Sequence, residues 1–385
     1  MDFATTPEQD RLVADVIAFG QRELSGRAAE NDALAQFDTA GWKAAAEFGI
    51  LGWPVPRRFG GAELDPVTCV LALEALGYGC ADNGLLFAIN NHLWACISYL
   101  LVHGSDEQRA RLLPGLADGS LVGAHAMTEP DAGSDVLALT TTARRDGDRY
   151  LVSGVKTFIS NAPVADVFVL FARTADDGPA QRALSAFLVR GNAPGLSVRA
   201  LDKSGLRGCP MGELRLDEVP VPVTDRLGGE GAGYQVFSST AEWERGYLLA
   251  SQVGTLRRLI ETASRHATSR RQFGQPIGSF QAVGHRVADL RVSLELSRLL
   301  LYKFGWLKRA GRLALLESSM LKLYLSESLV RAALDTQRIH GARGYVTDSG
   351  VEREVRDALA SVTYAGSSDI HRSIIARLGE ATDVC

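Results

Sequence analysis

The spacing of apolar residues divides this chain into three blocks, of which the first is helical. Apolar residues recur at the spacing of one helix face from Leu12 to Ile17. Thr6, followed by Pro7 and then by Gln9, has the pattern of a helix N-cap with a capping box. Further helices are predicted at residues 39–48, 66–76, 84–102 and 105–117.

The second block begins near residue 121, where short apolar runs separated by turn residues replace the helical spacing. Residues 140–145 and 150–159 are β-like, and Asp146-Gly147 between them is a hairpin signal. Other strands are predicted at residues 167–171, 184–189 and 214–219, the last ending at Pro220. Closely spaced strands of this kind predict a small barrel or sandwich.

The third block is helical again. Leu249, Val253, Leu256 and Ile260 form one apolar stripe, and long helices are predicted at 283–307, 313–339 and 370–378. Long helices with short links favour a four-helix bundle. We therefore expect an α+β chain with a helical domain at 1–120, a β-barrel domain at 121–233 and a helical bundle at 234–385.

Composition excludes several classes of protein. A net charge of −4 gives no electrostatic footprint for nucleic acid. No run of some 18 apolar residues predicts a membrane span, and the first residues do not have the pattern of a signal peptide, so a cytoplasmic protein is expected. The five cysteines include no Cys-x-x-Cys pair, so we expect neither a disulfide framework nor a metal site. No Gly-x-Gly-x-x-Gly opens a helix, which argues against a Rossmann dinucleotide site.

One loop sequence suggests chemistry. An apolar run at 121–124 leads into Met127-Thr128-Glu129-Pro130-Asp131-Ala132-Gly133-Ser134-Asp135, which is rich in hydroxyls and acids. Gly133 is expected to turn with φ > 0 or to let a ligand approach the backbone closely. Such a loop at a strand end suits a flat, polar cofactor, although Pro, Asp and Gly also make ordinary surface turns.

This nonapeptide resembles the signature of the flavin-dependent acyl-CoA dehydrogenase family. Three later segments match the same family in the same order, at residues 156–162, 270–274 and 337–357. The resemblance runs from the first helix to the last few residues. It implies FAD as cofactor, and a fold of helical domain, small β-barrel and four-helix bundle that agrees with the residue pattern.

The resemblance also implies which residues bind FAD. The loop and the following strand would supply Met127, Thr128, Gly133, Ser134, Phe158, Ile159 and Ser160, with Phe158 in place of the family's usual Trp. Arg270 and Phe273 belong to the family's Arg-x-x-Phe-Gly segment, whose arginine reaches the FAD of a neighbouring subunit. The remaining contacts would come from Gln281, Gln337, Gly341, Ser367 and Asp369. A site shared in this way requires at least a homodimer, or a homotetramer.

The catalytic base has two positions in this family. One is a Tyr-Glu-Gly segment, which reads Tyr364-Ala365-Gly366 here, and Ala365 cannot act as a base. The other lies at the start of a long bundle helix, where this chain has Glu244-Arg245. Glu244 is thus the candidate base, with Glu242 as its nearest rival and a helix-start acid, favoured by the dipole, as the structural alternative. The backbone N–H of Ala365 would polarise the thioester carbonyl, and Ser134, Arg245 and Tyr364 would contact the substrate.

A narrower resemblance concerns the substrate. Trp243-Glu244, the run at 160–166 and the missing Glu at 365 resemble dehydrogenases that oxidise prolyl groups on a peptidyl carrier protein. The alternatives are a short branched-chain acyl-CoA dehydrogenase that uses the same Glu244 and, from another class, a flavin monooxygenase or non-dehydrogenase flavoprotein on the same fold. The electron acceptor would be an electron-transfer flavoprotein or oxygen.

Overall fold

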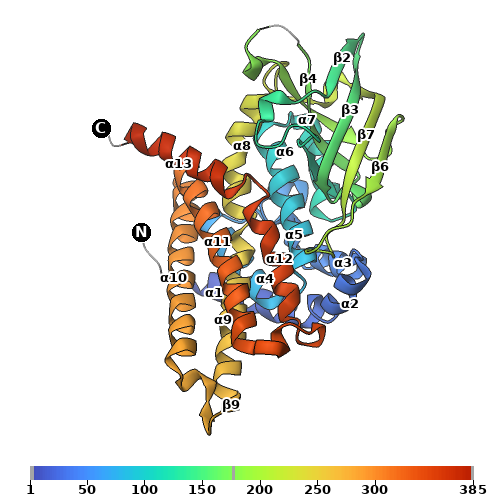
Figure 1. Ribbon diagram of the computed structural model, residues 1–385. Coiled ribbons are helices and arrows are strands. Elements are labelled where there is room, and N and C mark those ends of the chain that lie inside the picture. Colours follow the sequence, from blue (N-terminus) through green and yellow to red (C-terminus); the bar gives the residue numbers. More distant parts are fainter. Residues whose placement is uncertain (1–3, 176–177, 383–385) are drawn as a thin grey trace.

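The computed structural model describes residues 4–175 and 178–382, and its first part is helical as expected (Figure 1). Gln9 N–H donates to the Thr6 hydroxyl, and the Gln9 side chain accepts from Thr6 N–H, so the predicted capping box is confirmed. The helices are α1 (Pro7–Phe19), α2 (Ala28–Leu34), α3 (Thr39–Glu47), α4 (Pro66–Gly79), α5 (Asn83–His92), α6 (Ser98–His103) and α7 (Asp106–Ala117).

The helix predicted at 84–102 is interrupted by a π-helical segment, η4 (Leu93–Ile97), between α5 and α6. By length and composition alone the run Asn83–His103 is apolar enough to cross a membrane, but 83% of its most apolar window is buried inside the protein. It is therefore placed as a central core helix, with Trp94 and Tyr99 among the largest fully buried side chains.

The β domain is one eight-stranded sheet with the order β6-β7-β3-β2-β4-β5-β8, and β1 pairs in parallel with β4. The strands are β1 (Gly123–Ala126), β2 (Thr142–Asp146), β3 (Arg149–Ser160), β4 (Val167–Arg173), β5 (Leu184–Arg190), β6 (Leu196–Ala200), β7 (Met211–Pro222) and β8 (Arg226–Leu227). The sheet curls around its own apolar core, which includes Tyr150, Phe168 and Phe187. The predicted hairpin at Asp146-Gly147 is confirmed, whereas β7 continues past Pro220 to Pro222.

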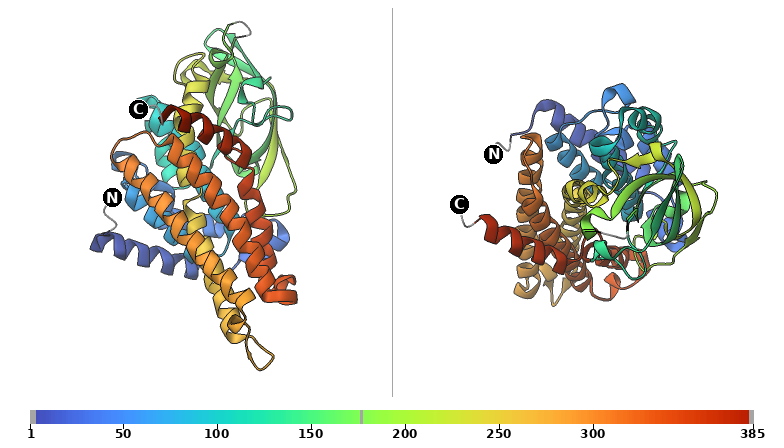
Figure 2. Two further views of the ribbon diagram at one scale, coloured as in Figure 1. Left: turned by 60° about the vertical axis from the view of Figure 1, so that its left-hand side comes forward. Right: turned by 90° about the horizontal axis from the view of Figure 1, so that it is seen from above.

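The C-terminal helices are α8 (Gly233–Tyr247), α9 (Ala250–Ser269), α10 (Gln281–Arg309), α11 (Leu315–His340), α12 (Val351–Leu359) and α13 (Ser368–Thr382). Helix α4 of the N-terminal part packs against α9 and α10, so both helical parts share one hydrophobic core. The β domain lies at one end of the molecule. The hairpin of β9 (Arg271–Gln272) and β10 (Gln275–Pro276) lies at the opposite end of the long helices (Figures 1 and 2).

Candidate active site

The loop at 127–135 is fixed to strand β3 from within the β domain. Lys156 Nζ donates to the Met127 carbonyl at 2.9 Å and to the Glu129 carboxylate at 2.8 Å. Thr157 N–H donates to the Thr128 carbonyl at 2.9 Å. The loop and the strand that the sequence predicted to flank one cofactor are therefore adjacent.

Glu129 and Lys156 form a buried ion pair behind this loop. Burial lowers the pKa of Lys156 to about 8, although the charge of Glu129 acts in the opposite direction. Burial also raises the pKa of Glu129, but the Lys156 charge and several hydrogen bonds outweigh it and leave that pKa at about 2. Because Glu129 also accepts from the N–H groups of Thr140 and Thr141, the loop is held from both sides.

Gly133 corrects one prediction. Its φ is not positive, so the expected left-handed turn is wrong. A Cβ added there would meet nothing closer than Thr128 Cγ2 at 4.0 Å. The backbone at this glycine is open, next to the exposed Ser134. Of the two predicted reasons for the glycine, only the close approach of a ligand remains.

Phe158 is presented outward by a bulge in β3. The pairing of β3 with β7 shifts register between Lys156 and Ile159, and Phe158 itself has φ 57°. Its side chain is 62% exposed, whereas Ile159 is buried. A strand aromatic that faced the core would be buried, so that alternative is wrong, and an unpaired ring beside the Met127–Ser134 loop suits a flat aromatic ligand. Ser160 follows at the strand end, where its carbonyl accepts from Asn91 of α5.

Glu244 lies in the last turn of α8, not at the start of the long helix as predicted. The helix dipole is unfavourable for a carboxylate at that end, so the helix-start alternative fails as well. Burial raises the pKa of Glu244 to about 7, while the neighbouring Arg245 acts to lower it. Glu244 also lies near the buried Tyr99, whose pKa is raised by burial and then by the charge of Glu244. A carboxyl group with this pKa exchanges protons near neutral pH, as a general base must.

Glu242, the rival base, is engaged elsewhere. Its carboxylate forms an ion pair with Lys308 and accepts from Ala314 N–H at 2.8 Å. The side chain is buried, and Lys308 also lies 4.3 Å from the centre of the Trp243 ring. Glu242 therefore joins α8 to α10 and α11, and Glu244 remains the candidate.

The raised pKa of Glu244 gives a stability prediction. Between its ordinary pKa of 4.5 and about 7, the folded protein binds this proton more tightly than the unfolded chain does, so stability falls as pH rises through that window. Glu244→Gln removes the titration. The free energy of unfolding of the variant relative to wild type is expected to increase by about 1–3 kcal/mol from pH 5 to pH 8. Urea denaturation at both pH values, at equal FAD loading, measures this difference, and an unchanged difference would contradict the raised pKa.

Ala365 is held in a strained conformation beside a buried histidine. Its φ is 52°, and Gly366 follows with φ 93°. Nε2 of the fully buried His371 lies 3.0 Å from the Ala365 carbonyl oxygen and would lie 2.9 Å from a Cβ at Gly366. Left-handed backbone at a non-glycine residue persists only where the surroundings impose it. His371 thus holds the Ala365–Gly366 peptide, which directly follows the Ala365 N–H that the family resemblance assigns to the thioester carbonyl.

Two basic side chains lie close to this peptide. Burial lowers the pKa of Lys322 to about 7 and that of His371 to about 4, and the charge of Arg245 lowers both further. Lys322 Nζ donates to the Ser361 carbonyl at 2.8 Å and lies 5.8 Å from the centre of the Tyr364 ring. His371 is therefore neutral at neutral pH, and the positive charge near Ala365 comes from Arg245 and the protonated fraction of Lys322, which favours enolate-like negative charge on a substrate carbonyl.

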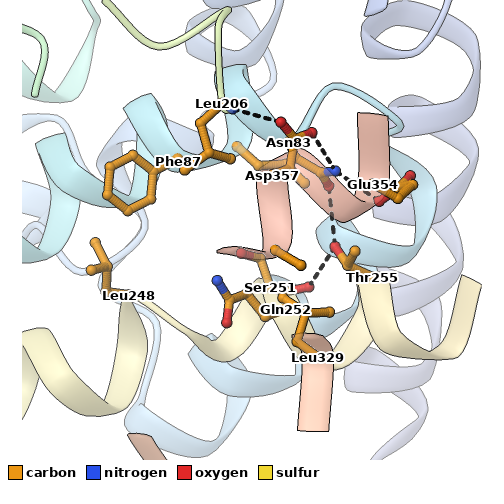
Figure 3. Close-up of a pocket in the computed structure, with 12 residues that line it drawn as sticks. Asn83, Phe87, Leu206, Leu248, Ser251, Gln252, Thr255, Leu329, Glu354 and Asp357 are labelled. Carbon is orange, nitrogen blue, oxygen red and sulfur yellow. Dashed lines mark hydrogen bonds between the residues drawn. The ribbon is translucent and has the colours of Figure 1, made fainter. Parts of the chain in front are cut away.

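A pocket opens near Tyr364, between α5, α9 and α12 (Figure 3). One side is apolar and is formed by Phe87, Leu206 and Leu248, while the other is polar. The polar residues that line it are Asn83, Ser251, Gln252, Thr255, Glu354 and Asp357. Tyr364 bridges the pocket to Ala365, because its hydroxyl accepts from Gln252 and its ring lies 4.6 Å from that of Phe87.

The other predicted cofactor residues gather at the opposite end of the long helices. Arg270 caps the C-terminus of α9, and its exposed guanidinium has no acceptor among the residues that the structure describes. Phe273 is 93% exposed at the hairpin tip with φ 51°, and Gln281 begins α10. Gln337 donates to the Gly344 carbonyl at 3.4 Å, and Gly341 has φ 58° and ψ −136°, a conformation open mainly to glycine.

These residues form a second cluster because α9, α10 and α11 meet there. Ala263, Ala267 and Ile339 share a small core with Val283, and His266 stacks on His340 at 4.1 Å. Arg270, Arg343 and His340 all lower the pKa of His266, after burial, so this end is electropositive. Ser367 and Asp369 lie apart from this second cluster, at the start of α13 just after Ala365. They therefore group with Ala365 and the residues around it. Ser367 Oγ accepts from Ile370 N–H, and the Asp369 carboxylate accepts from Arg372.

Sequence reasoning missed Gln252, His371 and Lys322. Gln252 follows Glu244 by eight residues, and that helical spacing was a usable signal for a shared face. His371 and Lys322 had no local signal, because only the tertiary fold brings them to Ala365.

Comparison with known proteins gives a consistent result over the whole chain. Residues 6–120, 124–219 and 231–379 match the N-terminal, middle and C-terminal domains of acyl-CoA dehydrogenase. The L-prolyl-[peptidyl-carrier protein] dehydrogenase of Pseudomonas fluorescens is 38% identical over 98% of this chain and 99% of its own. Among solved structures, the prolyl acyl carrier protein oxidase AnaB superimposes with a TM-score of 0.95 at 44% identity, over 97% of this chain and 99% of its own. The structure of PigA with FAD and proline gives 0.95 at 38% identity, over 98% and 99%.

Proposed function

Because the chain belongs to the acyl-CoA dehydrogenase family, we propose that it dehydrogenates an aminoacyl thioester, of prolyl type, carried on a carrier protein. The family makes it an FAD-dependent oxidoreductase that acts on thioesters. The observation that carries the proposal is the buried carboxyl of Glu244, whose pKa is raised to about 7, one helical turn before the pocket residue Leu248. The family's other base position holds Ala365. Glu244 is then the base of the dehydrogenation, because alanine at position 365 cannot accept a proton.

The residues present fit FAD. The exposed ring of Phe158, the open backbone at Gly133 and the hydroxyl of Ser134 suit a flat ring and its polar arm. The unpaired guanidinium of Arg270 suits a pyrophosphate, which it can bind through two hydrogen bonds. Met127, Thr128, Ile159 and Ser160 would complete the isoalloxazine side. Phe273, Gln281, Gln337, Gly341, Ser367 and Asp369 would hold the rest.

The chain's own residues supply the proton chemistry. Glu244 removes the α proton of the thioester and retains it on its carboxyl, which its pKa of about 7 permits. The Ala365 N–H donates to the thioester carbonyl as negative charge develops there, and His371 holds the carbonyl of the same residue in place. When bound, FAD supplies the acceptor for the hydride that leaves the β carbon as the α,β double bond forms.

The substrate assignment is supported by two independent lines. The relatives described above act, by name, on prolyl groups of carrier proteins and align over nearly the full chain. The pocket beside Tyr364 is small and six of its twelve lining residues are polar, whereas a hydrocarbon chain favours an apolar lining. A carrier-bound aminoacyl group therefore fits better than a simple acyl-CoA.

The decisive experiment is anaerobic bleaching of the bound flavin by a panel of thioesters. We expect prolyl-loaded carrier protein to bleach the flavin within one turnover, and isovaleryl-CoA and butyryl-CoA to leave it oxidised. Bleaching by the short acyl-CoA thioesters, with none by the carrier-bound prolyl group, would overturn the proposed substrate and assign the enzyme to ordinary acyl-CoA oxidation.

The remaining partners are part of the same proposal. An electron-transfer flavoprotein or oxygen would reoxidise the flavin, and the cytoplasm would be the compartment. The assembly would be a homodimer or homotetramer, because the two clusters of FAD residues lie at opposite ends of the long helices (Figure 1).

A further inference from the structure

Gln252 carries a hydrogen-bond acceptor that the protein itself does not use. Its Nε2 donates to the Tyr364 hydroxyl, while its Oε1 is buried and has no partner within the described part of the chain. The residue lines the pocket of Figure 3, where its carboxamide points into the space between Leu248 and Ser251. A buried acceptor left unpaired costs about 1–3 kcal/mol, so a donor is expected from the ligand.

The position of Gln252 relates this acceptor to the reacting carbon. Glu244, Leu248 and Gln252 follow one another at spacings of four, the last two across the short break between α8 and α9. Eight residues of helix rise about 12 Å, so Glu244 and Gln252 lie about two turns apart along one side of these helices, and Leu248 between them lines the pocket. Tyr364 also joins Gln252 to the Ala365 peptide. A substituent on the α carbon of a thioester bound at the Ala365 N–H can thus lie within reach of Gln252.

The charge around the polar end of the pocket favours a cation. Glu354 is paired with Arg258 at 3.1 Å, but Asp357 accepts only from Asn83 and from Leu206 N–H. No cation pairs with the buried Asp357 among the described residues, and burial raises its pKa to about 6. Lys203 lies near enough for its pKa to respond to the charge of Asp357, but among the described residues only Glu354, of these two carboxylates, forms an ion pair. The excess negative charge attracts a protonated amine more than it attracts a hydrocarbon.

We propose that Gln252 is a specificity-determining residue whose Oε1 accepts a hydrogen bond from the amino nitrogen of the aminoacyl thioester. This inference rests on the proposed function and adds the group that recognises the amine. The Gln252 acceptor distinguishes the pyrrolidine ring of a prolyl group from a carbocycle of the same size, because only the pyrrolidine ring has an N–H to donate. A site built to pair with such a donor discriminates strongly against an analogue that lacks it.

The test compares two carrier-bound thioesters, prolyl and cyclopentanecarbonyl, in single-turnover flavin reduction. Glu244 and the flavin site are unchanged in Gln252→Leu, which removes the acceptor at similar volume. We expect kred/Kd for prolyl to fall by about 10- to 100-fold, while the cyclopentanecarbonyl value changes by less than about threefold. Leu248→Met, on the apolar wall of the same pocket, is the matched control and should change both values by a common factor.

An equal fall for both thioesters in Gln252→Leu, or no fall for either, would overturn the proposal. FAD content and thermal melting show whether the variant is folded. If it is not, Gln252→Asn, which retracts the carboxamide by one methylene, must show the same selective loss. Binding of prolinamide against cyclopentanecarboxamide gives a separate readout. Wild-type enzyme that binds prolinamide through Gln252 but is not reduced by prolyl thioester would overturn the proposed function alone.

Discussion

Replacing Glu244 with glutamine is expected to slow the reduction of bound FAD by prolyl-carrier thioester by about 10³-fold, within the range typical of lost general-base catalysis. Glutamine keeps the shape of the side chain and cannot take the α proton. Glu242 cannot substitute, because Lys308 and Ala314 N–H occupy its carboxylate. Stopped-flow absorbance of the flavin, without oxygen, measures the rate.

The pH profile gives this prediction its control. Because the base must be ionised, the wild-type reduction rate should rise with pH and level off above about 7, the pKa of Glu244. The residual rate of Glu244→Gln should lack that rise, and Glu244→Asp, which keeps a shortened carboxylate, should retain it at a lower plateau. A glutamine variant that binds FAD and is reduced at the wild-type rate would remove Glu244 from the mechanism.

The predicted gain in stability of Glu244→Gln at pH 8 and its predicted loss of rate both follow from the same carboxyl group. Burying a carboxyl group costs free energy once it is charged, and the protein retains that cost at Glu244. A functional site is where such a cost is expected to persist, since stabilising substitutions there usually reduce activity.

Local sequence patterns predicted the elements of the fold well. Thr6 with Gln9, and Asp146-Gly147, specify their cap and hairpin through contacts within a few residues. The π segment at Leu93–Ile97 was not predicted, because no residue in that apolar run marks the extra backbone step. Strand β6 was also missed, since its residues are mostly exposed and its pairing with β7 is a tertiary contact.

The site was less predictable than the fold. Family resemblance was needed to choose Glu244, because an acid on a helix is common, and its position in α8 differed from the expectation. Gly133 suggested a positive φ that it does not have, since glycine alone cannot distinguish a turn from an open approach. The unpaired Oε1 of Gln252 and the contact of His371 with Ala365 depend on packing between α9, α13 and the segment before α13, which periodicity does not encode.

The separation of the two clusters leads to the second large prediction. Arg270 ends α9, a helix of 20 residues and so roughly 30 Å long, at the end away from the β domain that carries Phe158. We propose that Arg270 serves the FAD of a neighbouring subunit. Arg270→Ala is then expected to weaken FAD binding by about 10- to 100-fold, through loss of a charge-assisted bond to pyrophosphate. Equilibrium dialysis of FAD measures the change, and Arg271→Ala, one residue along and bonded to the Gly274 carbonyl, is the matched control.

Mixed oligomers test the sharing itself. If each site combines Glu244 of one subunit with Arg270 of the next, a pair made of one Glu244→Gln and one Arg270→Ala subunit contains one doubly altered site and one intact site. Subunits with different affinity tags, co-expressed and purified through both, should therefore recover about half of the wild-type activity per pair, although each variant alone is nearly inactive at limiting FAD. If both residues served one FAD within a single chain, every site in the mixture would carry one defect. Mixed oligomers no more active than the two parents would then contradict the shared site and require the long helices to bring Arg270 to the flavin of its own chain.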